Sequence, residues 1–319
     1  MKLLALLNSR LVKWGIALAA LTILFLSVDI QKLIAAFKNI KLGILLFFLF
    51  ISVVLIYISS LKWQLFMETA GKRISAFKLF AFYVLGYFIN LLVPSYVGGD
   101  VVRSWYAGKD VGKHQAFAAT VLERYTGFVA MMILALIFMW NVQQVTWQIR
   151  LVVIGMAASL AIVTILLLHP KFLDLMQKLC PPLAKYMPHF RKIQDALRYA
   201  HTQPILLVKA FILSLLFHLC TVLNVMVAGA CIGWCGIPYH DLFVVLPLIL
   251  LIGAIPITPS GLGIQEGAYS YFLQSLGATP DQALAVGLAL RAKSYILAIF
   301  GGFIWLYLTK NKTSEDKNN

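Results

Sequence analysis

The sequence has little charge. Charged side chains make up 12% of its 319 residues, whereas soluble domains carry about a quarter, and Asp and Glu together number only 12. Hydrophobic residues reach 61%, and the mean hydropathy is +0.87. This balance excludes an ordinary soluble globular protein. Apolar runs such as 42–61 have the length of about 20 residues that a membrane-spanning helix needs. We therefore predict an all-α polytopic membrane protein.

The sequence also lacks the short motifs of enzyme and metal chemistry. It contains no HExxH, no Walker loop and no nucleophile elbow. The four cysteines form no CxxC pair and have no metal-like spacing to histidine, which is typical of small buried hydrophobic residues. We therefore expect no metal, no cofactor and no catalytic residue, and we rank an enzyme below a transporter.

Basic residues, by contrast, are plentiful: 27 Lys and Arg give a net charge of +15. They lie mostly between apolar runs, which indicates the positive-inside bias of membrane proteins rather than nucleic-acid binding. Lys2, Arg10 and Lys13 precede the first apolar run and further lysines follow the last, so we expect both termini in the cytoplasm. The basic, amphipathic segment 170–204 is expected to be a cytoplasmic linker. The whole pattern predicts a multi-pass protein of the cytoplasmic (inner) membrane whose rim attracts anionic lipid headgroups.

Two stretches interrupt the apolar runs with helix-breaking residues: "PSYVGGDVVR" at 94–103 and "PSGLGIQEG" at 259–267. The charges on either side of the first stretch favour entry and exit on the same side, so we predict a re-entrant hairpin. Irregular backbone at membrane depth requires burial in protein or a wet cavity. Pro94 is expected to end the descending helix, and Gly98 and Gly99 to give the reversal its backbone freedom. The other predicted tip residues are Ser95 and Ser260, interpreted as helix caps, and Pro259, Gly261 and Gly263.

The two stretches also match each other. At an offset of 165 residues their Pro-Ser pairs coincide and Gly98 meets Gly263, and at an offset of 167 Arg124 meets Arg291. Because the two hairpins would enter from opposite faces, we predict about six full transmembrane helices and two re-entrant hairpins in an inverted repeat, as in secondary transporters. The alternative is a chance match of Pro, Ser and Gly in a low-diversity sequence. The expected single membrane domain, 1–319, comprises repeat halves at about 42–168 and 205–308, the linker 170–204 and a polar tail 309–319.

Seven charged residues fall in or next to apolar segments: Asp100, Arg103, Glu123, Arg124, Glu266, Arg291 and Lys293. A charge at the bilayer centre costs about 2.5–3.5 kcal/mol on insertion scales, so these groups are expected to pair or to face water. One interpretation is a polar cavity in which Arg124 and Arg291 bind phosphate through their planar donor forks. The other is that the charges, Asp100 and Arg103 for example, neutralise one another. Glu123 and Glu266 are also candidates to carry a coupled proton.

Three stretches resemble the lysylphosphatidylglycerol synthase transmembrane-region family of flippase-like membrane proteins: "LLVPSYVGGDVVRSW", "ATVLERYTGF" and "PITPSGLGIQEGAY". The resemblance extends from about residue 10 to 308. It implies the family's membrane fold and the translocation of a lipid. In multidomain members the membrane part moves an aminoacylated phospholipid that a separate soluble domain makes, and we expect that synthase domain to be absent here. The resemblance carries over Asp100, Arg103, Glu123, Arg124, Glu266 and Arg291 as site residues.

Together these observations predict the flipping of a phosphate-bearing lipid, either a glycerophospholipid or a polyprenyl-phosphate carrier. The expected partners are membrane lipids with anionic headgroups; a lipid-modifying enzyme and a homo-oligomer stay open, and nucleic acid is not expected. Two alternatives remain. The protein could be an integral membrane transferase acting on a lipid phosphate, or a non-transporting partner of a lipid-modifying enzyme.

Overall fold

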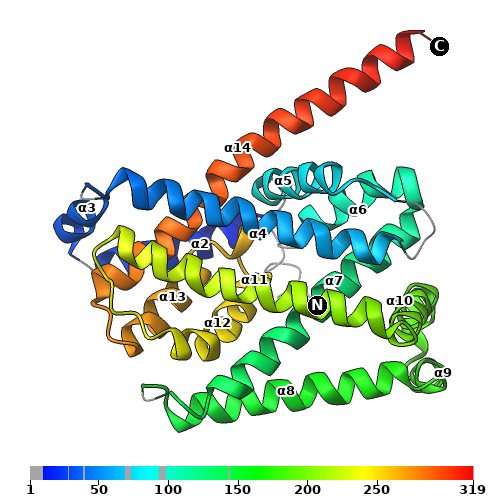
Figure 1. Ribbon diagram of the computed structural model, residues 1–319, viewed down its shortest axis with the longest axis horizontal. Coiled ribbons are helices and arrows are strands. Elements are labelled where there is room, and N and C mark those ends of the chain that lie inside the picture. The colour runs from blue at the N-terminus through cyan, green and yellow to red at the C-terminus, as the bar shows by residue number, and fades with distance from the viewer. Residues whose placement is uncertain are drawn as a thin grey trace.

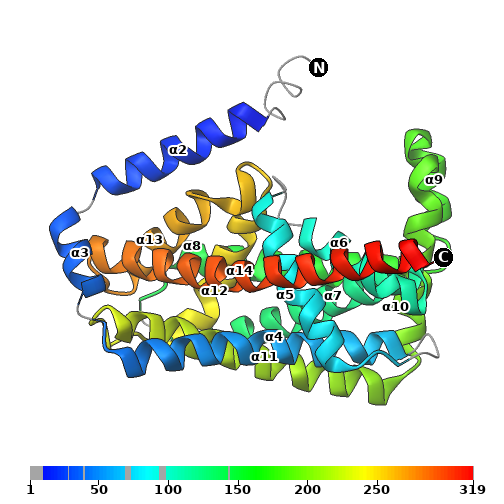
Figure 2. The ribbon, with the colours of Figure 1, turned by 90° about the horizontal axis from the view of Figure 1, so that it is seen from above.

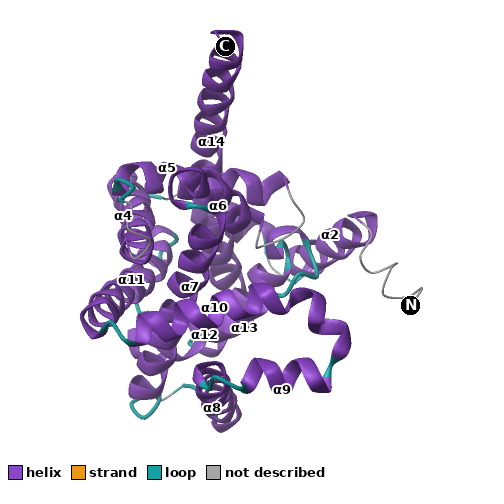
Figure 3. Cartoon of the chain, turned by 90° about the vertical axis from the view of Figure 1, so that its right-hand side faces the viewer, coloured by secondary structure: helices purple, strands orange, loops and turns teal. Residues whose placement is uncertain are grey.

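The computed structural model describes residues 10–27, 29–38, 40–68, 73–92, 98–142 and 144–318. Every regular element in this part of the chain is a helix, and no strand occurs in it (Figure 3). The all-helical part of the prediction is thereby confirmed.

Five helices are long and apolar enough to cross a membrane. They are α4 (Leu42–Glu68), α7 (Lys113–Phe138), α8 (Trp147–Leu168), α11 (Pro204–Cys231) and α14 (Pro280–Asn318), with the apolar part of α14 ending at Leu308. The predicted first span corresponds to α2 (Arg10–Leu26). Its residues 18–26 bend by 94° into α3 (Ile30–Lys38), and the pair would count as a sixth span only if taken together.

Two pairs of shorter helices complete the core. The helices α5 (Ala76–Leu92) and α6 (Gly98–Val111) pack against each other, as do α12 (Tyr239–Ala254) and α13 (Ile264–Ser275). A short 3-10 turn, η2 (Pro259–Gly261), connects the second pair. The two pairs lie towards opposite ends of the long axis, with α5 and α6 on the right and α12 and α13 on the left (Figures 1 and 2).

Close backbone approaches explain why small residues recur in these pairs. Gly99 lies so near α5 that a Cβ there would be 2.4 Å from the carbonyl oxygen of Gly86. In the second pair a Cβ at Gly261 would be 2.5 Å from the carbonyl oxygen of Gly253. Each pair also contributes to its own hydrophobic cluster, one around α5, α6 and the end of α4, the other around α11, α12 and α13.

The predicted linker contains α9 (Phe172–Leu179), a 3-10 helix η1 (Pro181–Tyr186) and α10 (Met187–His201). The two α-helices are joined by an ion pair of 2.7 Å between Arg191 and Asp174. Gln194 of α10 donates hydrogen bonds to the carbonyl oxygens of Leu167 and His169. These bonds satisfy backbone groups at the C-terminal end of α8, which would otherwise lack helical partners.

Candidate functional site

Five charged side chains from α4, α6 and α7 meet in what we call the first charged cluster: Lys62, Asp100, Arg103, Glu123 and Arg124. Arg103 donates to Asp100 Oδ1 and to Glu123 Oε2, each at 2.9 Å. Lys62 Nζ lies 3.4 Å from Glu123 Oε1. The side chains of Lys62, Arg103 and Glu123 are at most 3% exposed. Three cations thus share two carboxylates, which leaves these five residues with a surplus of one positive charge.

Arg103 is the interior anchor of this cluster. Its guanidinium carbon lies 3.9 Å from the ring centroid of Tyr83 and 4.4 Å from that of Trp63, in cation–π geometry. Because the side chain is 1% exposed and enclosed by aromatic rings, it cannot reach a ligand outside the protein. Its contacts fix α6 against α5 and α7.

Arg124 is the exposed end of the same cluster. Its Nη2 and Nε donate to Asp100 Oδ1 and Oδ2 at 2.9 and 3.1 Å, an arrangement with two parallel bonds. The side chain is nevertheless 54% exposed, whereas that of Asp100 is 21% exposed. Arg124 is therefore the member of the first charged cluster that an external anion can contact.

The second charged cluster consists of Glu266, Gln265 and Arg291, and it differs from the first in its exposure. Arg291 donates to Glu266 Oε1, to Gln265 Oε1 at 3.2 Å, and to the carbonyl oxygens of Ser260 and Gly261 at 2.9 and 3.3 Å. The side chains of Arg291 and Glu266 are 11% and 2% exposed. The second cluster therefore braces the turn between α12 and α13.

This turn has the backbone conformation that the helix-breaking residues suggested. Ser260, Gly261 and Gly263 all have positive φ, of 50°, 68° and 79°. Glycine adopts such angles without strain, and a serine there needs support from its surroundings. That support comes from Arg291 on the Ser260 carbonyl and from Glu266, whose Oε2 accepts the Gly263 N–H at 2.8 Å.

Lys293 does not belong to either cluster. It lies two residues beyond Arg291 on α14 and points to another neighbour, Asn224 of α11, whose Oδ1 accepts its bond. The Asn224 amide in turn donates to the carbonyl oxygen of Phe48 and to Ser52 Oγ on α4, at 3.1 and 3.2 Å. The structure thus separates Lys293 from the six other charged residues that the sequence grouped with it.

Asn90 connects the two pairs of short helices. Its Oδ1 accepts the N–H of Gly99 at 2.6 Å, next to Gly98 and Asp100 at the start of α6. Its carbonyl oxygen accepts a bond from Ser260 Oγ. The two helix-breaking stretches therefore meet at α5. The predicted tip residues Pro94 and Ser95 lie outside the described residues.

Sequence reasoning missed Lys62 and Asn90. The apolar run 42–61 stops before Lys62, which separates this lysine from the charges inside apolar segments, but α4 continues to Glu68 and buries it. The available signal was the apolar continuation, Leu65 to Met67. Asn90 is a single amide in an apolar helix and gave no signal of its partners.

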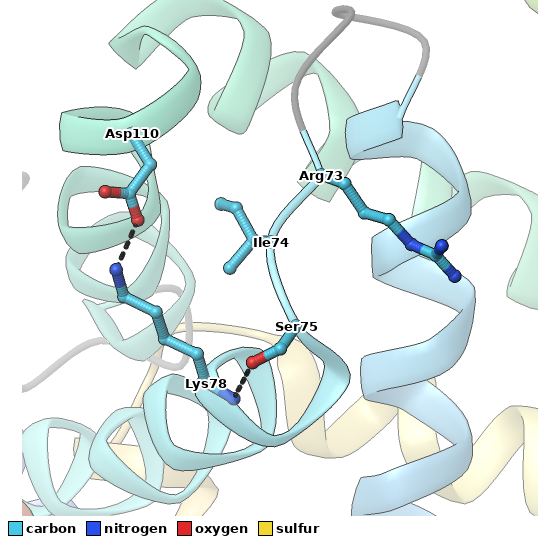
Figure 4. A pocket seen from close by; sticks show the side chains of 5 residues that line it. All are labelled: Arg73, Ile74, Ser75, Lys78 and Asp110. Atoms are coloured by element: carbon cyan, nitrogen blue, oxygen red, sulfur yellow. Dashed lines mark hydrogen bonds and ion pairs between the residues drawn. The ribbon is translucent and has the colours of Figure 1, made fainter.

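An open pocket at the end of the molecule near the start of α5 is a weaker candidate. It is lined by Arg73, Ile74, Ser75, Lys78 and Asp110 (Figure 4). Lys78 Nζ is bonded to Asp110 at 2.7 Å, and the Arg73 side chain points away and pairs with Glu68. Both cations are thus engaged at the rim. Among the described residues no group of three or more His, Cys, Asp or Glu could hold a metal ion.

The family model of the lysylphosphatidylglycerol synthase transmembrane region matches residues 11–302. The chain belongs to this family. Both charged clusters, Asn90 and Lys293 lie within the matched range. A relative is the UPF0104 membrane protein MJ1595 of Methanocaldococcus jannaschii, which is 20% identical over 309 residues, covering 91% of this chain and 92% of the relative. No solved structure matches the chain. Membership connects this multi-pass membrane protein with lipid-related functions.

Gly127 makes room for the first charged cluster, which gives a test of its packing. A Cβ at Gly127 of α7 would lie 2.9 Å from Lys62 Nζ, so Gly127→Ala should displace the ammonium from its position in the cluster. We expect a loss of about 1–3 kcal/mol in the free energy of unfolding, measured by denaturant titration in detergent. The matched control is Gly155→Ala on α8, where a Cβ meets nothing within 4 Å; it should be neutral or stabilise by up to about 1 kcal/mol. Equal behaviour of the two variants would contradict the packing described.

Proposed function

We propose that this protein translocates a phosphate-bearing lipid, a glycerophospholipid or a polyprenyl-phosphate carrier, across the cytoplasmic membrane. The observation that carries the proposal is Arg124, a guanidinium that is 54% exposed at the edge of a cluster with surplus positive charge. The planar guanidinium bonds two phosphate oxygens at once, and it is less strongly hydrated than an ammonium. Family membership supports a lipid as the bearer of that phosphate.

The hydrogen bonds suggest how Arg124 would exchange partners. When Arg124 turns from Asp100 to a phosphate, Asp100 keeps its second partner, because Arg103 Nε donates to Oδ1 at 2.9 Å. Lys62 and Glu123 stay paired inside the protein. The headgroup would therefore be received without leaving an internal charge unpaired, which offsets part of its desolvation cost. The lipid tails would remain in the bilayer.

The inverted repeat that we propose is supported by the order of the helices. The series α4, α5, α6, α7 recurs as α11, α12, α13, α14, each as one long helix, two short ones and a second long helix. The first residues of α7 and α14, Lys113 and Pro280, are separated by 167 positions, the offset that also aligns Arg124 with Arg291. The two pairs of short helices are the proposed re-entrant hairpins.

The crossing of α4 and α11 supports the inversion itself. Lys62 Nζ of α4 donates to Ser214 Oγ of α11 at 3.2 Å, and Asn224 Nδ2 of α11 donates to Ser52 Oγ of α4 at 3.2 Å. At an offset of 162 residues, Ser52 corresponds to Ser214 and Lys62 corresponds to Asn224. Antiparallel helices that exchange equivalent contacts are related by a twofold axis perpendicular to them. For spanning helices this axis lies in the membrane plane, the symmetry of inverted-repeat transporters.

The orientation that we propose follows from the loops. The basic linker with α9 and α10 and the C-terminal end of the chain lie at the same end of the molecule (Figure 2). The positive-inside bias assigns that end, and the N-terminus, to the cytoplasm. Rocking of the two halves about the Asn90–Ser260 contact would then open the path between the hairpins to either side.

Arg124→Gln tests the proposal directly. Proteoliposomes containing fluorescent phosphatidylglycerol would be treated with a membrane-impermeant quencher, and the rate of lipid exposure measured. We expect the variant to be at least about tenfold slower than the wild type, because one charge-assisted contact is worth about 1.5–3 kcal/mol. Replacing the labelled lipid by a polyprenyl phosphate in the same assay would distinguish the two lipid classes.

The control variant is Arg191→Gln in α10. Arg191 is 52% exposed and bonded to an aspartate at 2.7 Å, so it matches Arg124 in exposure and pairing but lies outside both clusters. It should transport like the wild type. The lipid recovered after transport should have an unchanged mass, since the proposal involves no covalent step. Equal rates for Arg124→Gln and the wild type would refute the proposal, and a new lipid mass would favour a transferase.

A further inference from the structure

Lys293 is a charged residue in the apolar part of α14 whose charge the protein does not balance. Among the described side chains, no carboxylate oxygen lies within 4.0 Å of its Nζ. Lys62, the other lysine at the crossing of α4 and α11, has Glu123 at 3.4 Å. At the offset of 167 residues the counterpart of Glu123 is Leu290. The second half therefore lacks a carboxylate at the position where the first half has Glu123.

Asn224 holds the ammonium group of Lys293 in a defined place. Its amide nitrogen is fully engaged with the Phe48 carbonyl oxygen and Ser52 Oγ, which orients its Oδ1 towards Lys293. Asn224 is 1% exposed, and the ammonium also lies 5.5 Å from the ring centroid of Phe48. An ammonium has three donors, and Asn224 uses one of them. A half-buried cation fixed by an amide and lacking a carboxylate is a site that an external anion can complete.

The two lysines lie at different depths. Ser52 and Lys62 are ten residues apart on α4, and a helix rises 1.5 Å per residue, so their contacts are separated by about 15 Å along the helix axis. Ser52 carries the contact with Asn224 and thus with Lys293, and Lys62 belongs to the first charged cluster with Arg124. In the proposed orientation a cation would therefore be available in each half of the membrane.

We infer that Lys293 and Asn224 form a second anion site, which binds the phosphate of the translocated lipid in the outer half of the membrane after the phosphate leaves Arg124. The ligand chemistry is a phosphate monoester or diester, which supplies the negative charge that Leu290 cannot. This inference deepens the proposed function and rests on it. In this inference Arg124 and then Lys293 bind the same phosphate group, whereas Arg291 has a structural role.

The test measures lipid binding rather than transport. Native mass spectrometry would record the binding of dioleoylphosphatidylglycerol to the purified protein in detergent, with dioleoylglycerol as the lipid that has the same chains and no phosphate. Lys293→Met should weaken the binding of one phosphatidylglycerol molecule by about tenfold or more, the effect of losing a charge-assisted contact. The binding of dioleoylglycerol should be unchanged. Lys293→Arg keeps the charge and should retain the lipid. Lys209→Met, at an exposed position of α11, is the control for loss of a positive charge.

The outcomes separate this inference from the proposed function. Wild-type binding by Lys293→Met, or the same weakening by Lys209→Met, would overturn the Lys293 site. Weakening by Lys293→Met but not by Arg124→Gln would leave this site standing and refute the role of Arg124. Displacement of the lipid by millimolar inorganic phosphate would identify free phosphate, not lipid, as the ligand and overturn the lipid assignment. Lys293→Gln, which keeps a hydrogen-bond donor without the charge, replaces Lys293→Met if that variant does not fold.

Discussion

Glu123→Ala is expected to lower the free energy of unfolding by about 3–5 kcal/mol, the effect of breaking a buried ion pair from one side. Glu123 is the common partner of Arg103, at 2.9 Å, and Lys62, at 3.4 Å. All three side chains are at most 3% exposed. Without the carboxylate, Lys62 keeps only Ser214 Oγ as a hydrogen-bond acceptor among the described residues, and Arg103 keeps Asp100. Denaturant titration of the purified protein in detergent, followed by circular dichroism, measures the loss.

Glu68→Ala is the control, because Glu68 ends the same helix as Lys62 and pairs with Arg73 at 2.8 Å. The side chains of this pair are 38% and 79% exposed, so its loss should cost less than about 1 kcal/mol. The double variant Lys62→Met/Glu123→Gln removes both charges and should recover part of the stability lost in Glu123→Ala. If Glu123→Ala cost no more than Glu68→Ala, the ion pairs inside the first charged cluster would not be stabilising in the way described.

The membership of the two clusters, apart from Lys62 and Gln265, could be predicted from sequence for a physical reason. A charged residue in an apolar segment is costly unless it is paired or wet, so Asp100, Arg103, Glu123 and Arg124 stand out in a chain with few charges. Their proximity follows from one turn of α6 and from adjacent positions on α7. The Glu266–Arg291 pair was accessible in the same way, through the repeat.

The roles within the clusters could not be predicted. Arg124 and Arg291 occupy matching positions at an offset of 167 residues, and the sequence interpretation gave both the task of binding phosphate. The structure exposes 54% of the Arg124 side chain and 11% of that of Arg291. The difference arises from the backbone carbonyl groups of Ser260 and Gly261, which accept bonds from Arg291. The position of a backbone carbonyl group cannot be read from the residue type.

Contacts between residues far apart in the sequence could not be predicted either. Asn224 contacts Ser52 across 172 positions and Ser260 contacts Asn90 across 170. Ser52, Asn90 and Asn224 are single polar residues in apolar helices, and Ser260 lies in a turn whose residues give no sign of a partner in α5. Only the comparison of the two halves at an offset of 162 relates Ser52 to Ser214 and Lys62 to Asn224. That comparison becomes informative once the antiparallel crossing of α4 and α11 is known.

Arg291→Met is expected to destabilise the protein by about 3–5 kcal/mol, because it leaves a buried carboxylate without its cation. Glu266 is 2% exposed, and its remaining partner is the N–H of Gly263. The damage should be local, since Arg291 also holds the carbonyl oxygens of Ser260 and Gly261 in a turn with positive φ angles. Hydrogen exchange measured by mass spectrometry should therefore rise in the peptide 259–267, with little change in the peptide 98–105 of the first half.

Two further variants establish whether the buried charge is the cause. Arg191→Met removes an exposed arginine from an exposed ion pair and should cost less than about 1 kcal/mol. Glu266→Leu/Arg291→Met removes the orphaned carboxylate and should regain stability over Arg291→Met, although the Ser260 and Gly261 carbonyl groups still lack their donor. Exchange that rose equally in both peptides would contradict a local brace and assign Arg291 to the packing of the whole helix core. Exchange confined to 259–267 would support a role for Arg291 in shaping the turn between α12 and α13 rather than in binding phosphate.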